Sequence, residues 1–388
     1  MIRKSVALSA VLAVGGTLAL SACTENVEPS DASGGAITVD SSASACDVSA
    51  AEAPSGNLVF NVTNSGNEVT EFYLLGEDGL RIFGEVENVG PGLSRDLVVQ
   101  AGPGSYFTAC KPGMVGDGIR APFVVTDSGV DVSPTGPIGE QLDDATAAYG
   151  AYVRDQTAQL VVTTDAFARD YVRGNFVDAR AQYATARMPW ERIEPVAESF
   201  GDLDPRLDLR EADLEPGQEW TGWHAIEKDL WPPKGYTQFS EKERRRLAAL
   251  LIADTAELNE RVQELEFTPD QLGNGAKELL DEVATGKVTG EEEFWSHTDL
   301  WDFQANLDGA RIAYEELRGV VKQKNPELAK TLDKQFTEVQ GMLNQYRDGD
   351  GYDFVFYDEL TPKQVQELAD GVDALGEPLS QLTATVVL

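Results

Sequence analysis

Short hydrophobic stretches separated by turn sequences dominate the chain from residue 46 to residue 127. Four of them are rich in Val, Leu and Phe, and segments that contain Gly, Pro or Asn lie between them; the stretches are 58–62, 72–75, 96–99 and 123–125. Short strands at this regular spacing are typical of a small sandwich or barrel. We therefore predict a β-sandwich over residues 46–127, followed by a Ser-, Pro- and Gly-containing linker at 128–139.

From residue 140 onward, hydrophobic residues recur with the period of an α-helix. The clearest example is a single stripe formed by Leu247, Leu251, Leu258, Val262 and Leu265. Further helical patterns cover residues 141–173, 175–200, 275–284, 302–323, 326–347 and 362–382. The sequence thus predicts an all-α helical bundle over residues 140–388.

The first 45 residues fit neither domain. Two basic residues precede an uncharged stretch rich in Ala, Val and Leu, which ends in Leu-Ser-Ala-Cys at Cys23. This arrangement predicts a signal peptide at 1–22, and its ending is similar to a bacterial lipobox, whose cysteine is lipidated. Ser, Ala, Gly and Asp dominate residues 24–45, so the segment 23–45 is expected to be a flexible, lipid-anchored tether. We expect an exported protein, either a lipoprotein on the extracytoplasmic face of the cell membrane or a periplasmic protein.

Acidic residues outnumber basic ones, with 66 Asp and Glu against 31 Lys and Arg, which gives a formal net charge of −35. Such a surface repels phosphate backbones, so nucleic-acid binding is excluded. Acidity of this kind favours solubility, and it also supplies carboxylates that can hold a cation.

Two pairs of polar residues in the predicted bundle have the spacing of metal ligands. His224 and Glu227 lie at i and i+3, so on a helix one cation can contact both; the Glu-x-x-His ligands of di-iron bundles use the same geometry. Glu191 and Glu194 form a second such pair, and an acidic stretch, 202–211, lies between the two. Oxygen ligands with one imidazole suit iron, manganese or calcium. The alternative is a set of solvated acidic helix faces.

The chain's second histidine, His297, lies in an acidic and aromatic segment before a predicted helix. A capped helix start explains most of this segment. Glu292, His297 and Asp299 are nevertheless candidate ligands or residues that orient the ligands.

The predicted β domain contains two cysteines, Cys46 and Cys110, and no histidine. In an exported chain such a pair most often forms a disulfide. A thiolate metal site with a carboxylate such as Glu71 is the alternative. A blue-copper site is excluded because it requires two imidazoles.

Together these motifs resemble the EfeO family of iron-uptake proteins over nearly all residues after the tether. The stretches that carry the resemblance are 191–195, 207–211, 221–227 and 296–306. The resemblance implies a cupredoxin-like domain followed by an imelysin-like bundle of a family named after peptidases. It implies one metal site made by His224, Glu227, Glu191, Glu194 and Asp208. In the β domain, it implies a metal site at Cys46, Glu71 and Cys110, with Glu85 and Glu87 as further acids.

The function that the resemblance implies is capture of iron, as Fe2+ or Fe3+, outside the membrane and its delivery to a permease. The implied partners are an iron permease (EfeU-type) and a haem peroxidase (EfeB-type), and the β domain is expected to bind copper, zinc or iron. The alternative is a metal-dependent peptidase with Glu227 as general base. Against a peptidase, the chain lacks a His-Glu-x-x-His motif.

Overall fold

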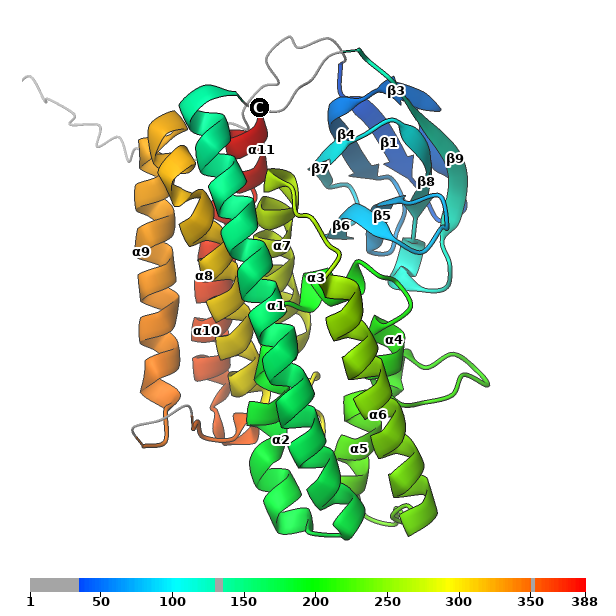
Figure 1. The fold of residues 1–388 in the computed structure, drawn as a ribbon, viewed down its shortest axis with the longest axis vertical. Helices are drawn as coiled ribbons and strands as arrows, with labels where there is room; N and C mark the ends of the chain where they lie inside the picture. Colours follow the sequence, from blue (N-terminus) through cyan, green and yellow to red (C-terminus); the bar gives the residue numbers. More distant parts are fainter. Residues whose placement is uncertain (1–34, 130–134, 350–352) are drawn as a thin grey trace, which may run out of the picture.

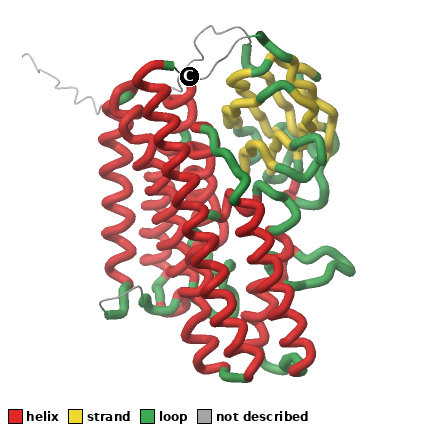
Figure 2. The backbone as a smooth tube through the Cα atoms, viewed as in Figure 1, coloured by secondary structure: helices red, strands yellow, loops and turns green. Residues whose placement is uncertain are grey.

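A β domain packs beside the upper half of a long helical bundle in the computed structural model, which describes residues 35–129, 135–349 and 353–388 (Figures 1 and 2). The strands span residues 37–126 and the helices 136–387. This confirms the predicted order of a small β domain followed by an all-α bundle. The predicted signal peptide, Cys23 and the first part of the tether lie outside the described residues.

The β domain consists of two mixed sheets, with the strand orders β2-β1-β4-β7 and β3-β9-β8-β5-β6. β1 is parallel to β4 and β3 is parallel to β9. Inward-facing residues such as Phe60, Phe72 and Phe123 fill the space between the sheets, as expected of a sandwich. The strands are β1 (Ile37–Ser41), β2 (Cys46–Val48), β3 (Glu52–Pro54), β4 (Gly56–Asn64), β5 (Thr70–Leu75), β6 (Ile82–Val89), β7 (Ser94–Ala101), β8 (Gly104–Cys110) and β9 (Ile119–Thr126).

The predicted boundary between tether and β domain is wrong, because β1 lies within residues 23–45. Ile37 and Val39 face the core, and Thr38 and Asp40 face solvent. This alternation is a strand signal. It is only five residues long and is flanked by Ser, Ala and Gly, whose composition led to the prediction of a tether.

The helices of the bundle enclose one continuous hydrophobic core. α1 packs against α2, α6 and α8, whereas α7 packs against α8 and α11. The helices are α1 (Gly136–Arg173), α2 (Phe176–Glu191), α3 (Glu194–Glu198), α4 (Asp204–Leu207), α5 (Gly222–Leu230), α6 (Glu241–Val262), α7 (Pro269–Glu282), α8 (Asp299–Lys324), α9 (Pro326–Leu343), α10 (Pro362–Leu379) and α11 (Leu382–Val387), and a π-helical turn, Val283–Lys287, follows α7. No helix in the described parts of the chain has both the length and the apolar composition that a membrane span requires.

The predicted helix at 175–200 is two helices. α2 ends at Glu191 and α3 begins at Glu194, with Pro195 in its first turn. Proline has no N–H to donate, so it fits a helix start better than a helix interior. Glu191 and Glu194 therefore lie on either side of a break. The prediction that they form a pair on one helical face is wrong.

Backbone and side-chain hydrogen bonds join the two domains, and β6 and β7 face α7. The N–H of Ile82 donates to the carbonyl of Ser199 at 2.9 Å, and the N–H of Gln100 donates to the carboxylate of Asp270 at 2.8 Å. At Gly201, whose φ is +73°, a Cβ would lie 2.2 Å from the carbonyl oxygen of Leu80. Only glycine permits this approach, so the two domains are closely fitted along this edge.

Candidate metal centre

The contact between the start of α5 and the end of α4 brings one carboxylate residue and one imidazole residue together. Gly222, the first residue of α5, has a φ of +82°, and a Cβ there would lie 2.1 Å from the carbonyl oxygen of Leu207. Glycine at this position thus lets α5 rest directly on the end of α4. Asp208 follows Leu207, and His224 lies in the first turn of α5, so this contact places the two side chains side by side.

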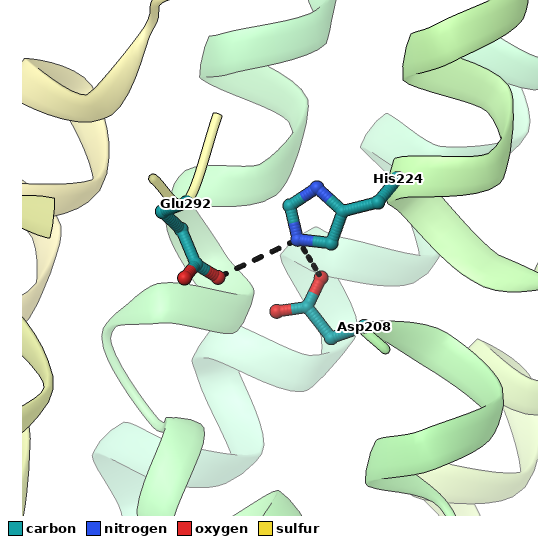
Figure 3. Close-up of side chains that lie close together, drawn as sticks. All are labelled: Asp208, His224 and Glu292. Atoms are coloured by element: carbon teal, nitrogen blue, oxygen red, sulfur yellow. Dashed lines mark ion pairs between the residues drawn. The ribbon is translucent and has the colours of Figure 1, made fainter. Parts of the chain in front are cut away.

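His224 lies between two carboxylates (Figure 3). Its Nε2 atom is 3.5 Å from Asp208 Oδ1 and 3.4 Å from Glu292 Oε1. His224 is 1% exposed, Glu292 6% and Asp208 7%. Ligand atoms that are each about 2.1 Å from a shared ion lie roughly 3.0–3.4 Å apart. The three side chains, which we call the central trio, are thus arranged to bind one cation with little movement.

Glu227 orients the imidazole. Its Oε2 atom is 3.1 Å from His224 Nδ1, and its Oε1 atom accepts from the backbone N–H groups of Trp295 and Ser296 at 2.9 and 2.7 Å. A carboxylate only accepts, so His224 Nδ1 carries the proton and donates. In the neutral imidazole the lone pair is then on Nε2, which faces the carboxylates and has no hydrogen-bond partner in the described chain.

A buried arginine connects several acids of the site. Arg187 is fully buried and forms ion pairs with Asp208 and Glu191, and its Nε lies 2.8 Å from Glu293 Oε1. Burial opposes its charge, but the carboxylates outweigh burial and raise the pKa of Arg187 well above its ordinary value. Trp190 Nε1 donates to Asp208 Oδ2 at 2.8 Å. Arg187 contacts Oδ1, the oxygen that faces His224, and Trp190 bonds Oδ2, so both oxygens of Asp208 are held in place.

A buried lysine neutralises the other predicted acids. Lys287 Nζ lies 3.1 and 3.0 Å from the two oxygens of Glu194 and 3.4 Å from Glu191 Oε2. Asn306 donates to Glu194 Oε2 at 3.1 Å and to the carbonyl of Glu191 at 2.7 Å. Glu191, Glu194 and Asp208 are close enough to share an ion, but Lys287 and Arg187 already supply the positive charge there.

The charges of the central trio depend on one another. Burial opposes protonation of His224, but the nearby carboxylates of Asp208, Glu227 and Glu292 raise the pKa of His224 well above its ordinary value. Burial also opposes the charge of Glu292, yet Lys287, His224 and Arg210 hold the pKa of Glu292 well below its usual range. Without a metal, a proton thus occupies the place of the cation, and a metal ion must displace it.

Of the other candidates near α8, only Glu292 belongs to the central trio. Asp299 is buried, and its Oδ1 accepts from the backbone N–H of Glu293 at 3.2 Å. His297 is half-buried, has a φ of 59°, and is in none of the ligand groups formed by the described residues. The structure therefore does not bring His297 to the site.

The candidate metal ligands Cys46, Cys110 and Glu71 of the β domain are already bonded to other groups of the protein. Cys46 on β2 and Cys110 on β8 form a disulfide that links the two sheets. Glu71 is buried, accepts from the hydroxyl of Tyr73 at 2.5 Å, and pairs with Lys111 at 3.6 Å. With both sulfur atoms bonded to each other, these residues do not fit a thiolate metal site. Glu85 and Glu87 on β6 face a cavity between the domains.

Three charged residues of the site were not predicted from the sequence: Arg187, Lys287 and Glu293. Arg187 lies four residues before Glu191, a spacing that indicates an ion pair on one helix face, so it was accessible to sequence reasoning. Glu293 belongs to the acidic run 291–293, in which Glu292 and Glu293 are both buried and only Glu291 is exposed, so the sequence alone does not separate them. No local pattern singles out Lys287, which reaches Glu194 from 93 residues away.

Comparisons with known proteins agree with this architecture. The family described as Imelysin, Peptidase_M75, matches residues 145–382. The chain is 36% identical over 339 residues to proteins named iron uptake system component EfeO from Escherichia coli (strain K12) and Shigella flexneri. It is 35% identical to the protein of that name from Escherichia coli O157:H7, and all three alignments cover 86% of both chains. The chain therefore belongs to the EfeO family of iron uptake system components, and its helical part is an imelysin bundle.

Proposed function

We propose that this protein captures iron outside the membrane at Asp208, His224 and Glu292 and delivers it to a membrane permease. The observation that carries the proposal is His224 Nε2, a buried nitrogen that faces two carboxylates and has no hydrogen-bond partner among the described residues. Iron binds carboxylate oxygens and imidazole nitrogens, so a site of two carboxylates and one imidazole can hold it without a thiolate. The relatives' name, iron uptake system component, agrees with iron as the cargo.

Capture followed by delivery requires that the ion can leave. Asp208 and Glu292 line a cavity of about 500 Å³ between the two domains, so two of the three ligands face open space. Arg187 shares Asp208 with the ion and so weakens the attraction of that carboxylate for the ion. Both features favour reversible binding of a cargo ion.

A peptidase function for the bundle is less well supported. A general base on a metal-bound water needs an oxygen within hydrogen-bond reach of that water. Both oxygens of Glu227 are already used, one by His224 and the other by two backbone N–H groups. Glu227 therefore suits a positioning role better than proton abstraction.

Export and anchoring are part of the proposal. The sequence at residues 1–23 favours a signal peptide with lipidation at Cys23. A lipid anchor at the membrane surface would keep the binding protein close to an EfeU-type permease, and an EfeB-type haem peroxidase is the second proposed partner. Membership of the EfeO family supports partners within one uptake system.

Iron binding by single-site variants tests the proposal. Equilibrium dialysis with ferrous ion in the absence of oxygen, followed by elemental analysis, gives stoichiometry and affinity. We expect His224→Ala to abolish binding at the site, and Asp208→Asn and Glu292→Gln each to weaken it at least about 100-fold, because each removes one ligand.

The chain supplies a matched control for two of these changes. His297→Ala removes the other histidine and Glu291→Gln removes an exposed acid next to Glu292, and neither residue belongs to a ligand group among the described residues. Both should bind iron like the wild type. If His224→Ala retains wild-type stoichiometry and affinity while circular dichroism shows a folded bundle, the site assignment fails.

A further inference from the structure

The three ligands of the central trio come from three separate segments of the chain (Figure 3). Asp208 follows α4, His224 lies on α5, and Glu292 lies between the π-helical turn and α8. A metal site needs its ligands held within about 0.5 Å of the binding geometry. Contacts outside the trio must therefore fix these segments relative to one another.

Lys228 on α5 contacts both of the other segments that carry ligands. Its ammonium group forms an ion pair with Glu211, three residues after Asp208. The same group lies 5.1 Å from the ring centre of Trp295, three residues after Glu292. A single ammonium group thus joins the three segments from which the ligands come.

Three aromatic rings, which we call the aromatic cage, surround this ammonium group. The ring centres of Trp220, Tyr236 and Trp295 lie 5.5, 5.6 and 5.1 Å from Lys228 Nζ. A cation within about 6 Å of a ring centre is attracted by the negative face of the ring. The rings of Trp220 and Trp295 are themselves 5.7 Å apart. Because the side chain of Lys228 is only 15% exposed, water screens these attractions little.

Hydrogen bonds connect the aromatic cage to the ligands. Trp220 Nε1 donates to the carbonyl of Leu209, the residue after Asp208, at 2.6 Å. The backbone N–H of Trp295 donates to Glu227 Oε1 at 2.9 Å, and the other oxygen of Glu227 accepts from the imidazole of the trio. A displacement of either tryptophan would therefore move Asp208 or the imidazole.

We propose that Lys228 is a positioning residue for iron binding, which together with the aromatic cage holds the central trio in the arrangement that binds the ion. The inference rests on the proposed function, because it explains how that site is kept in place. Lys228 acts through Glu211, Trp220 and Trp295 and not by contact with the ion. Such support raises affinity because it reduces the cost of ordering the ligands when the ion arrives.

The charge of Lys228 and its positioning contacts predict opposite effects of Lys228→Met. Removal of a cation from the helix that carries His224 would by itself strengthen the binding of another cation. Loss of the positioning contacts weakens binding instead. Because changes outside the ligands typically cost about 10–100-fold in metal affinity, we expect the Kd for ferrous ion to rise at least about fivefold, with unchanged stoichiometry.

The measurement is equilibrium dialysis of the full chain with ferrous ion without oxygen, and circular dichroism checks that each variant is folded. Lys228→Arg keeps the charge and can still contact the aromatic faces, so its Kd should stay within about twofold of the wild type. A protein that only needs a well-packed side chain at this position would not distinguish arginine from methionine in this way.

Lys277→Met is the matched control. The side chain of Lys277 is 16% exposed and pairs with Asp281 on α7, a helix that carries no ligand of the trio. This variant loses the same charge and should bind iron like the wild type. The inference is overturned if Lys228→Met binds iron as tightly as the wild type or more tightly, if both methionine variants weaken binding equally, or if Lys228→Arg is as weak as Lys228→Met.

A second pair of variants decides the matter if Lys228→Met does not fold. Glu211→Gln removes the ion pair and leaves the aromatic cage, whereas Glu215→Gln removes another exposed acid of the same segment. Glu211→Gln should have the higher Kd of the two, and equal values would overturn the inference. His224→Ala separates the two proposals. If it binds iron normally, the proposed function fails; if it has lost binding while the Lys228 or Glu211 variants match their controls, only the inference fails.

Discussion

Lys287 donates to both carboxylate oxygens of Glu194, at 3.1 and 3.0 Å, and the lysine is completely buried. The acids Glu191 and Glu282 lie 3.4 and 3.7 Å from the same ammonium group. Burial opposes the charge of Lys287, yet these carboxylates raise its pKa well above the ordinary value. A fixed cation thus holds together acids that would otherwise repel one another inside the bundle.

Lys287→Met should destabilise the bundle by about 3–5 kcal/mol, because it leaves buried carboxylates without a counter-charge. Adding Glu194→Gln should restore part of this loss, since it removes one of the uncompensated charges. Urea-induced unfolding of the metal-free protein, followed by circular dichroism, measures both effects.

An exposed lysine provides the comparison for Lys287→Met. Lys330 pairs with Glu327 at 3.8 Å, and both side chains are largely exposed to water. Lys330→Met should therefore change the free energy of unfolding by less than about 1 kcal/mol. Equal effects of the two lysine substitutions would show that the buried pair carries no special stability.

Glu227→Gln should weaken iron binding by about 10–100-fold without changing its stoichiometry, because Glu227 orients His224 instead of contacting the ion. Glutamine retains the oxygen that accepts from Trp295 and Ser296 but no longer accepts from His224 Nδ1. Isothermal titration with ferrous ion separates affinity from stoichiometry. Loss of all binding, as expected for His224→Ala, would instead identify Glu227 as a ligand.

The sequence predicted which residues belong to the site better than it predicted how they are arranged. His224 and Glu227 lie on one face of α5 as predicted, because residues at i and i+3 of a helix keep the same relative position wherever the helix packs. Glu191 and Glu194 have the same spacing, but the chain breaks between them and Lys287 occupies their carboxylates. The sequence around Glu194 gives no indication of its counter-ion Lys287, which lies 93 residues away.

The same reasoning explains which helices were predicted correctly and which were missed. Helices with clear apolar periodicity were predicted best. The helix expected at 302–323 is α8, Asp299–Lys324, and the predicted stripe from Leu247 to Val262 lies on α6. The start of α7 at Pro269 was missed by six residues, because Asp270 and Gln271 interrupt the apolar pattern in its first turn, whose start is defined by the Thr268 capping box. The cavity between the domains depends on how β6 faces α7, which only tertiary packing determines.

The two cysteines of the β domain should give no free thiol in the protein as isolated, because Cys46 and Cys110 are joined. A Cys23→Ser background leaves only these two thiols to count. Reduction should lower the stability of the β domain by about 2–5 kcal/mol. Thiols that are titratable without reductant and become protected when metal is added would contradict the disulfide and favour a thiolate site.

Lipid attachment at Cys23 should hold the protein at the membrane. We expect the wild type to incorporate labelled fatty acid and to sediment with membranes, and Cys23→Ser to lose both properties. Multiple acyl chains on one cysteine suffice for stable anchoring of an acidic protein. A wild-type protein that is unlabelled and remains in the soluble fraction would show that residues 20–23 are not a lipidation signal.

Asp299 links stability to pH. Burial, with a smaller contribution from Glu292, raises the pKa of Asp299 to about 7, and its Oδ2 atom has no hydrogen-bond partner in the described chain. In the unfolded chain the pKa is about 3.9. Between these values the folded state binds the proton and the unfolded state does not, so the contribution of this group to stability decreases as pH rises from about 4 to about 7.

Asp299→Asn should therefore stabilise the metal-free protein at pH 8, by roughly 1–4 kcal/mol, and leave it nearly unchanged at pH 4.5. The amide keeps an oxygen that can accept from the N–H of Glu293, so the local fold is preserved. Urea unfolding at several pH values measures the difference between variant and wild type. Asp370→Asn, at an exposed position on α10, should show no such pH-dependent gain. If Asp299→Asn destabilises the protein equally at both pH values, Asp299 is ionised in the folded state and its carboxylate has a partner that the metal-free structure does not reveal.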